Sequence, residues 1–571
     1  MTLIVQRKVS TEVIQALQAA GVSPLMSRLF AARGVVDVSQ MSANLSSLLP
    51  PQNLTHNQTM AKLLADAITA NKRLLVISDY DADGATATAV AVKGLRALGA
   101  NVGFLVPNRF EYGYGLTPEI VALAALQKPD VIITVDNGIA SVDGVQAANA
   151  LGIQVLITDH HLPGQETPQA ACIINPNQHG CTFASKHLAG VGVMFYCLLG
   201  LRAELRERGA YIAEQGAQKP EPNLTELLDL VALGTVADLV KLDENNRILV
   251  EQGLRRIRAG ACSHGITALL KIAAREPATA TAQDLGFYVG PRLNAAGRLD
   301  DMTLGIQCLL AESESQAMQI AQQLHDLNLQ RRSIEADMQD SANISLEEIQ
   351  IAHQYSISLY QPDWHQGVIG ILASRIKERH HRPVIAFANA GDGLLKGSGR
   401  SIAGLHLRDA LDLLSKHQPA LILKFGGHAM AAGLTIKYED FNLFKLSFEA
   451  VVKSLLTEAD LQSVLEVDGN LNANELTFQA AQMLENQVWG QGFAPPLFYD
   501  EFEVVNQRIL GEKHLKLSLK PTSSQASLVI DAIYFNQTEL LDSRIQAAYQ
   551  LQTNSYNGTQ KVQLNVRYVA T

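Results

Sequence analysis

Residues 70 to 175 alternate between short apolar runs, rich in β-branched side chains, and amphipathic runs with helical periodicity. This alternation is typical of βαβ units, in which helices connect the strands of a parallel sheet. The predicted strands are RLLVIS (73–78), NVGFLV (101–106), DVIITV (130–135), QVLIT (154–158) and CIIN (172–175). We therefore predict an α/β fold whose main domain contains a parallel sheet.

Further domains are expected, because the 571 residues of the chain exceed the roughly 100–200 residues of one domain. A break at Leu49-Pro50-Pro51 ends a helical N-terminal segment, and a long amphipathic helix follows the parallel-sheet domain. Near the C-terminus, leucines alternate with polar residues over 515–519, as in a strand of a small β-barrel. The predicted domains are an N-terminal helical extension (1–50), the parallel-sheet domain (51–311), a connecting helix (312–350), a smaller α/β domain (351–455) and a terminal β-domain (460–571).

Charge, cysteine content and hydropathy exclude several classes of protein. The formal net charge of −10 excludes a nucleic-acid binder that works by overall positive charge, so any such binding requires a local groove. The five cysteines form no CxxC pair, which argues against a zinc knuckle and a disulfide framework. Since no run of about 18 apolar residues occurs, we expect a cytoplasmic protein that does not enter a membrane.

The stretch DYDADG, residues 79 to 84, places a carboxylate at every second position before a glycine. A calcium loop of the EF-hand type requires a Glu at its twelfth position and a helix before the loop. This chain has Val90 at the twelfth position and the strand-like LLVIS before the motif. The motif is therefore predicted to follow a strand and to lead, through Gly84, into a helix that begins at Ala85.

Acidic residues and histidines follow three of the predicted strands, and the carboxyl ends of parallel strands meet at one edge of a sheet. Asp238 follows a further apolar segment, in which the pair Gly234-Thr235 predicts a turn. The residues of these motifs are Asp79, Asp81, Asp83, Asp136, Asp159, His160, His161 and Asp238. Oxygen ligands with one or two imidazoles suit Mn²⁺ or Mg²⁺ better than tetrahedral zinc. Two such ions about 4 Å apart would activate a water and stabilise the leaving oxygen in phosphoester hydrolysis.

Two of these acids also have simpler interpretations. An aspartate after a strand, such as Asp136, often caps the following helix, and Asp159 can serve only to orient the two histidines. However, so many carboxylates at one edge would repel each other strongly without cations between them. The convergence of three acidic strand ends therefore favours a site for two metal ions, which Asp136 could bridge.

The motifs DYDADG, VDNG, DHH and GTVAD, in this order, resemble those of the DHH phosphoesterase superfamily. Together with PNRFEYGYGL, GPRLNAAGRLDD, WHQGVIGILASRI, GSGRS and FGGHAMAAG, the resemblance extends from about residue 50 to residue 571. Over this length the chain is similar to bacterial exonucleases of the superfamily that digest single-stranded DNA from 5′ to 3′. The resemblance implies a role in DNA repair and recombination, with two Mn²⁺ or Mg²⁺ ions as cofactors.

The resemblance also implies roles for individual residues. The implied metal ligands are Asp81, Asp83, Asp136, His160 and Asp238, with Asp79 adjoining them. His161 would lie beside the scissile phosphate, so that Asp136, His160 and His161 are the expected catalytic residues. Many members of the superfamily have a histidine where this chain has Ile77, so one ion loses a nitrogen ligand, and Asp79 is the candidate to replace it. The implied substrate-binding residues are Arg109, Arg292, Asn294, Ser398, Arg400 and His428.

By the same resemblance, the glycine clusters KGSGRS and FGGHAMAAG belong to a DHH-associated domain that faces the catalytic domain across a cleft. Their glycines are expected to form turns whose backbone N–H groups approach the DNA backbone, and Arg292, Ser398 and Arg400 to bind its 5′-terminal phosphate. The terminal β-domain is similar to an oligonucleotide-binding (OB) barrel, which would hold single-stranded DNA. The implied partners are a single-strand-binding protein and a helicase, and we expect a monomer.

Two alternative functions remain at this stage. The first is a phosphodiesterase of the same superfamily that acts on short RNA or a cyclic dinucleotide, and the added terminal β-domain argues against it. The second is a non-catalytic DNA-binding scaffold of the same fold. Such a scaffold is expected to lack acids of the metal site, whereas this chain contains all of them.

Overall fold

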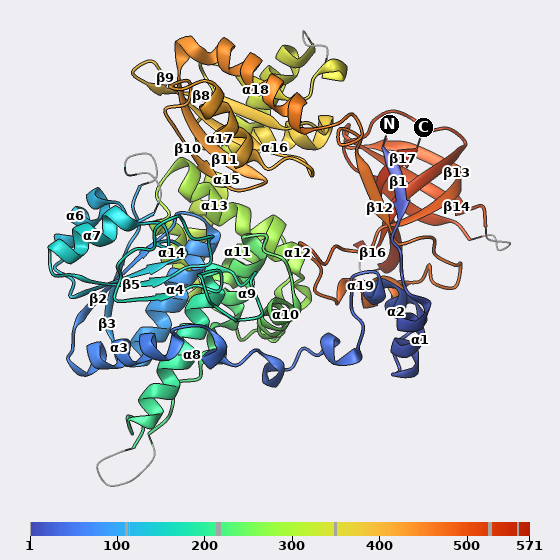
Figure 1. The fold of residues 1–571 in the computed structure, drawn as a ribbon. Helices are drawn as coiled ribbons and strands as arrows, with labels where there is room; N and C mark the ends of the chain where they lie inside the picture. Colours follow the sequence, from blue (N-terminus) through green and yellow to red (C-terminus); the bar gives the residue numbers. More distant parts are fainter. Residues whose placement is uncertain are drawn as a thin grey trace. The chain divides into compact units, whose positions relative to one another are not determined.

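The computed structural model describes residues 2–108, 112, 115–212, 219–347, 351–523, 528–556 and 559–570 (Figure 1). The chain forms two compact units. One unit consists of Gln6–Asp326 with Val467–Thr571, and the other of Leu327–Glu466 with Met1–Val5. Among the described helices, none combines the length and the apolar character needed to cross a membrane.

A five-stranded sheet with the order β3-β2-β4-β5-β6 forms the centre of the first unit, and all its strands are parallel. The strands are β2 (Arg73–Ser78), β3 (Asn101–Leu105), β4 (Val131–Val135), β5 (Gln154–Thr158) and β6 (Cys172–Ile174). Each coincides with a predicted strand to within one residue at either end. The predicted α/β fold with a parallel sheet is therefore confirmed.

Helices cover both faces of this sheet. On one face, Ile77 and Ile132 belong to an apolar cluster with residues of α6 (Pro118–Ala125) and α7 (Val142–Ala150). On the other face, the strands pack against α4 (Ala82–Ala97) and α8 (Gly190–Glu207), of which most residues are buried. Both faces of the strands are consequently apolar, as expected of a parallel sheet between two layers of helices.

Further helices of this unit surround α4 and α8. They are α3 (Asn57–Thr69), α9 (Leu228–Ala237), α10 (Glu244–Arg258), α11 (His264–Ile272), α12 (Ala282–Asp284), α13 (Gly290–Leu299) and α14 (Thr303–Leu310). A π-helix over Leu285–Val289 connects α12 to α13. Helix α4 packs against α8, α9, α13 and α14, so the helix that follows DYDADG lies at the centre of this layer.

The predicted long helix is confirmed as α15 (Glu314–Glu347), and the two compact units divide within it, at Leu327. The second unit contains a sheet of order β10-β11-β9-β8-β7. Its elements are β7 (Ile357–Tyr360), α16 (Ile369–His380), β8 (Val384–Gly391), β9 (Leu394–Arg400), α17 (Leu407–His417), β10 (Lys424–Gly427), β11 (Ala431–Lys437) and α18 (Phe441–Leu455).

The prediction of a turn at KGSGRS is wrong, because residues 396 to 400 lie within strand β9. The glycines of this strand serve close packing instead. A Cβ on Gly397 would lie 2.6 Å from the ring of Phe387, and one on Gly399 would lie 2.8 Å from the side chain of Leu407. The second cluster does contain a turn, since residues 428 to 430 connect β10 to β11.

The terminal β-domain is a closed barrel of order β13-β14-β15-β17-β16, which confirms the predicted barrel. Its strands are β13 (Phe498–Leu510), β14 (His514–Pro521), β15 (Ile530–Tyr534), β16 (Arg544–Tyr556) and β17 (Thr559–Ala570). In β14, Leu515, Leu517 and Leu519 are buried, and the residues between them are only partly buried. This is the alternation that the sequence predicted.

The N-terminal segment contains the two expected helices, α1 (Thr11–Ala19) and α2 (Pro24–Ala31). It also contains a strand that the sequence patterns missed, β1 (Leu3–Gln6), which pairs with β12 (Val464–Val467). The strand is too short and too exposed to show a clear alternation of apolar residues. The domain boundaries proposed from the sequence, at residues 50, 311, 350 and 455, stay predictions.

A buried ion pair connects the N-terminal segment to the region before the barrel. Arg33 donates two hydrogen bonds of 2.9 Å to the carboxylate of Asp468, and both side chains are 1% exposed. The guanidinium also donates to the carbonyl of Ala494 and lies over the ring of Trp489. The pair therefore has the bidentate geometry and the additional hydrogen bond that a buried charge requires.

We predict that Arg33→Ala lowers the free energy of unfolding of this region by about 3–5 kcal/mol, because it leaves the Asp468 carboxylate buried without its partner. Urea denaturation, followed by Trp489 fluorescence, measures this effect. The chain has two tryptophans, so the measurement uses a Trp364→Phe background. As a control, Arg255→Ala removes the exposed partner of Glu251 and should change the free energy by less than about 0.5 kcal/mol. Equal effects of the two substitutions would contradict the prediction.

Candidate metal centre

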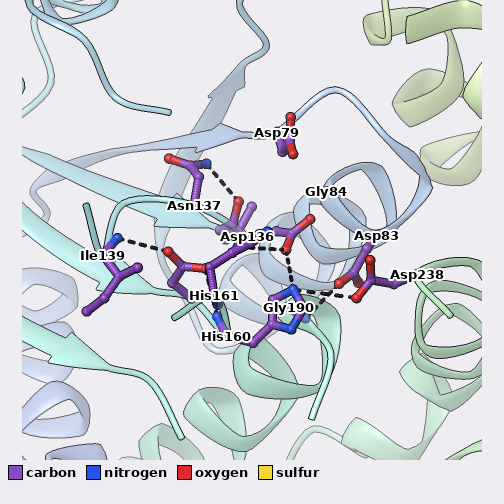
Figure 2. A network of polar contacts seen from close by, with 12 residues as sticks. Asp79, Asp83, Gly84, Asp136, Asn137, Ile139, His160, His161, Gly190 and Asp238 are labelled. Carbon is purple, nitrogen blue, oxygen red and sulfur yellow. Dashed lines mark hydrogen bonds and ion pairs between the residues drawn. The ribbon is translucent and has the colours of Figure 1, made fainter. Parts of the chain in front are cut away.

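The acidic motifs follow three strands that are neighbours in the sheet. Asp79 follows β2, Asp136 follows β4 and Asp159 follows β5, and the sheet order places β2, β4 and β5 side by side. Figure 2 shows the side chains of these motifs gathered at this edge, with Asp238 joining them from α9. The predicted convergence of the strand ends is confirmed.

The first acidic motif forms the beginning of α4, which starts at Ala82 and not at Ala85 as predicted. Asp81 is the residue before the helix, and its Oδ1 accepts hydrogen bonds from the backbone N–H groups of Asp83 and Gly84. This N-cap explains the earlier start, because it supplies partners for N–H groups that the first turn leaves unpaired. Gly84 is needed for close packing, since its Cβ would lie 2.6 Å from the carbonyl oxygen of Asp79.

Asp83 belongs to α4, and its side chain lies against the N-terminus of α8. The residue is 1% exposed. Its two carboxylate oxygens accept hydrogen bonds of 2.6 Å from Gly190 N and 2.9 Å from Val191 N. These bonds and the positive end of the helix dipole favour the charged carboxylate. Even so, burial and the neighbouring Asp81 raise the pKa of Asp83 to about 7. The site thus holds more negative charge than its own hydrogen bonds compensate.

Asp136 has a backbone φ of 60°, in the left-handed region that few non-glycine residues adopt. It does not cap the next helix, because α7 begins at Val142, so that simpler interpretation of Asp136 is wrong. Its Oδ1 lies 3.1 Å from Nε2 of His160. Burial and the carboxylates of Asp83 and other nearby aspartates raise its pKa well above the usual value.

Asp238 is the residue that follows α9 and caps its C-terminus. The predicted turn at Gly234-Thr235 is wrong, because both residues lie inside α9. Position 234 requires a glycine because of contacts that the sequence does not show. A Cβ at this position would lie 2.2 Å from Thr86 Oγ1 and 2.8 Å from Asp83 Oδ1. At the end of this close-packed helix, Asp238 Oδ2 lies 3.5 Å from His160 Nε2. Burial and the surrounding aspartates raise the pKa of Asp238 well above its usual value.

Asp159 orients the histidines, as its simpler interpretation predicted. Its Oδ1 accepts a hydrogen bond of 2.8 Å from His161 Nδ1 and others from the backbone N–H groups of His160 and His161. Its Oδ2 accepts from Ile139 N. Burial favours the neutral form of His161, but the bond to Asp159 outweighs it and raises the pKa of His161 to about 9. His161 therefore carries a positive charge at neutral pH when no metal ion is bound.

Three overlapping groups of side chains have ligand atoms close enough to hold a metal ion, each within 4.8 Å of one another. The groups are Asp79, Asp81 and Asp136; Asp83, His160 and Asp238; and Asp136, His160 and His161. Asp136 and His160 each belong to two groups. Carboxylate oxygens with one imidazole are the donor set of Mn²⁺ and Mg²⁺, and divalent cations would offset the mutual repulsion of the aspartates. The residues present therefore fit the cofactors expected from the sequence.

The predicted substrate-binding residues are distributed over both units. In the first unit, Arg292 is 8% exposed and donates to the carbonyl of Tyr288 and to Nδ1 of His325. Asn294 Oδ1, on the same helix, accepts from Ala82 N. Ser398 and Arg400 lie on β9 of the second unit, where Arg400 donates to Ser398 Oγ at 3.2 Å, and the exposed His428 lies in the turn before β11. Arg109 lies outside the described residues.

Comparison with known proteins assigns the chain to a family. Residues 73–235 match the DHH family N-terminal domain, residues 349–454 the DHHA1 domain and residues 467–568 the RecJ OB domain. The single-stranded-DNA-specific exonuclease RecJ of Dickeya dadantii is 51% identical over 555 residues, which cover 95% of this chain and 96% of that protein. The chain belongs to the RecJ family.

Solved structures of the RecJ family have the same fold. RecJ of Thermus thermophilus in complex with Mn²⁺ is 29% identical and has a TM-score of 0.81, with 100% of this chain and 79% of that chain covered. The complex of the same protein with Mg²⁺ is 27% identical and has a TM-score of 0.74, with coverage of 100% and 78%. The resemblance to the DHH superfamily, the fold and the assignment to single-strand-specific exonucleases are thus confirmed.

The backbone N–H groups of Gly190 and Val191 are parts of the candidate site that the sequence analysis missed. Their N–H groups hold both oxygens of Asp83. A Cβ on Gly190 would also lie 2.6 Å from Asp136, so this position requires glycine. The signal in the sequence is LAGVGV (188–193), a run of small residues at the start of a helix. The run indicates a helix N-terminus that binds a carboxylate only when the neighbouring acid is known from the structure.

We predict that Asp159→Asn lowers the pKa of His161 by about 1–3, because a negative partner at hydrogen-bond distance stabilises the charged imidazole. Asparagine keeps the shape and an acceptor oxygen for the histidines but removes the charge and the oxygen that accepts from Ile139 N. The pKa is measured by NMR titration of histidine-labelled protein in EDTA, with the His161 signal assigned by its loss in His161→Gln. Asp143→Asn, at an exposed aspartate of α7, is the matched control and should leave this pKa unchanged. An unaltered pKa in Asp159→Asn would refute the assigned role.

Proposed function

We propose that this chain is a metal-dependent exonuclease that degrades single-stranded DNA from its 5′ end by hydrolysis of phosphodiester bonds. The observation that carries the proposal is the convergence of Asp79, Asp81, Asp83, Asp136, His160 and Asp238 in overlapping ligand groups. Membership of the RecJ family supports the choice of substrate. Its members with solved structures have been crystallised with Mn²⁺ and with Mg²⁺.

The acids and His160 would hold two Mn²⁺ or Mg²⁺ ions, and Asp136 belongs to two of the three ligand groups. When bound, such ions lower the pKa of water and neutralise charge on the phosphate. His161 would lie beside the scissile phosphate, where Asp159 fixes its ring through a hydrogen bond at Nδ1. The orientation of this ring supports its role as a group that contacts the substrate.

For the 5′-terminal phosphate, we propose a binding site at Ser398 and Arg400 of the second unit, with Arg109, Arg292 and His428 as further contacts to DNA. In the second unit, Arg400 is partly buried, and its guanidinium donates to Ser398 Oγ and to the carbonyl of Gly399. Among the described residues, no carboxylate forms an ion pair with Arg400. A partly buried cation without an acidic partner is suited to bind an anion.

The N-terminus of α16 adds to this anion site. Gly370 is the second residue of α16, and its Cβ would lie 2.9 Å from Ser398 Oγ and 3.0 Å from Arg400 Nη2. The glycine thus lets the positive end of a helix dipole approach the two side chains. These groups together support the binding of a phosphate in the second unit.

We also propose partners and a location for the protein. The OB domain and the names of the family members support single-stranded DNA as the substrate. A single-strand-binding protein and a helicase are the proposed protein partners, since both would supply the enzyme with single strands. We further propose that the protein acts as a monomer in the cytoplasm.

Digestion of end-labelled DNA tests the proposed activity. With Mn²⁺ or Mg²⁺, a 5′-labelled single strand should lose its label at once, whereas a 3′-labelled strand should shorten progressively. Blunt duplex DNA should resist. Digestion from the 3′ end would contradict the polarity, and faster hydrolysis of a dinucleotide than of a long strand would favour the short-substrate phosphodiesterase.

In the same assay, we predict that Asp136→Asn lowers the rate more than about 100-fold, beyond the usual effect of residues that only support a ligand. Asparagine keeps the packing against Gly190 but removes the charge of a carboxylate that belongs to two of the three ligand groups. Binding of single-stranded DNA in EDTA should remain, which separates catalysis from affinity. Turnover close to that of the unmodified protein in Mn²⁺ would refute the metal assignment.

For the phosphate pocket, we predict that Arg400→Ala lowers the preference for a 5′-phosphate over a 5′-hydroxyl strand by about tenfold or more. Hydrogen bonds to charged groups contribute about 1.5–3 kcal/mol, which corresponds to this factor. The measurement is the ratio of kcat/KM for the two substrates. Arg408→Ala, at an exposed arginine of α17, is the matched control and should keep the ratio of the unmodified protein. An equal loss in both variants would indicate general electrostatic attraction and not a pocket.

A further inference from the structure

Helix α13 packs directly against the first acidic motif (α13 in Figure 1). Asn294 Oδ1 accepts a hydrogen bond of 2.8 Å from Ala82 N, which lies between Asp81 and Asp83. One turn further along α13, a Cβ on Gly297 would lie only 1.9 Å from the carbonyl oxygen of Tyr80. Two positions of α13, three residues apart, therefore touch the backbone that carries the acids.

The N–H group of Ala82 needs a partner from outside α4. The first N–H groups of a helix have no acceptor within the helix. Asp81 Oδ1 already serves the N–H groups of Asp83 and Gly84, and Ala82 is 2% exposed. Asn294 supplies the acceptor from a position 212 residues away in the sequence. Without it, a buried N–H group would lack a partner, and the turn would have to move to find water.

The neighbouring Arg292 has different contacts. Its Nη1 donates to the carbonyl of Tyr288 and its Nε to Nδ1 of His325, a residue of α15. Two positions apart on a helix, side chains point in nearly opposite directions. The two residues of α13 for which the sequence predicted contact with DNA thus differ in their hydrogen-bond partners, and Asn294 bonds to the acidic motif.

We propose that Asn294 is a positioning residue, which fixes the spacing of Asp81 and Asp83 for metal binding through Ala82 N and does not act as a contact to DNA. This inference rests on the proposed function, because it takes the acidic cluster as the metal centre. Gly297 serves the same purpose, since it allows α13 to lie against Tyr80. In this way α13 holds the acids from outside, as residues around a metal site commonly hold its ligands.

The test measures Mn²⁺ binding itself, by titration calorimetry on metal-free protein, beside single-stranded DNA binding in EDTA. Asn294→Ala should weaken Mn²⁺ binding by about 10- to 100-fold, the usual effect of losing a residue that supports a ligand. Its affinity for DNA should stay unchanged. Asn294→Asp keeps an oxygen at the same place and should bind Mn²⁺ nearly as tightly as the unmodified protein. Arg292→Ala, on the same helix, is the matched control and should keep Mn²⁺ affinity while it weakens binding of 5′-phosphorylated DNA.

Gly297→Ala provides an independent test from the other contact, because its methyl group must displace Tyr80. It should also weaken Mn²⁺ binding and leave DNA binding intact. If Asn294→Ala does not fold, as judged by circular dichroism, Gly297→Ala and Asn294→Asp decide the question. The proposal would be overturned if Asn294→Ala bound Mn²⁺ as tightly as the unmodified protein. Where Asn294→Ala does not fold, the same result in Gly297→Ala would overturn it. A variant that lost only DNA binding would overturn it as well. If the unmodified protein binds no Mn²⁺, the metal centre itself is refuted, which is a separate outcome.

Discussion

The contact between Asp83 and the N-terminus of α8 holds the metal-ligand edge together. A buried carboxylate without partners costs several kcal/mol, and the N–H groups of Gly190 and Val191 offset part of this cost. Because Asp83 lies in the helix after β2, whereas α8 follows β6, the contact joins an early and a late part of the domain. The remaining uncompensated charge, expressed in the pKa of about 7 for Asp83, is what a divalent cation would neutralise.

Close backbone packing keeps the ligand residues in place. A Cβ on Gly84, Gly190, Gly234 or Gly297 would lie within 2.8 Å of a backbone or side-chain atom of the acidic motifs or their immediate neighbours. At each of these positions a helix approaches the ligands with its main chain. Main chain is stiffer than a long side chain, so the acids are held near their final geometry before any ion arrives. We infer that this rigidity lets several like charges remain close together.

The sequence predicted those features that depend on local pattern and failed where distant segments meet. Each strand of the parallel sheet followed from an apolar run, and the strand-end acids followed from parallel topology. The start of α4 was placed three residues late, because the cap by Asp81 turns an acidic stretch into a first helical turn. The pair Gly234-Thr235 suggested a turn, but both residues lie inside α9, where the glycine allows the helix to pack closely against Asp83. The bond from Ala82 to Asn294 spans 212 residues, beyond the reach of any local rule.

Two of the three ligand groups differ in chemistry. The side chain of Ile77, 1% exposed, packs in the apolar cluster between the sheet and helices α6 and α7 and offers no ligand atom. The group around Asp79 is made of oxygen atoms alone, whereas the group around Asp238 includes the imidazole of His160. Imidazole favours transition metals such as Mn²⁺ over Mg²⁺, and carboxylates accept both. We therefore expect the His160 group to select Mn²⁺ and the all-oxygen group to accept either ion.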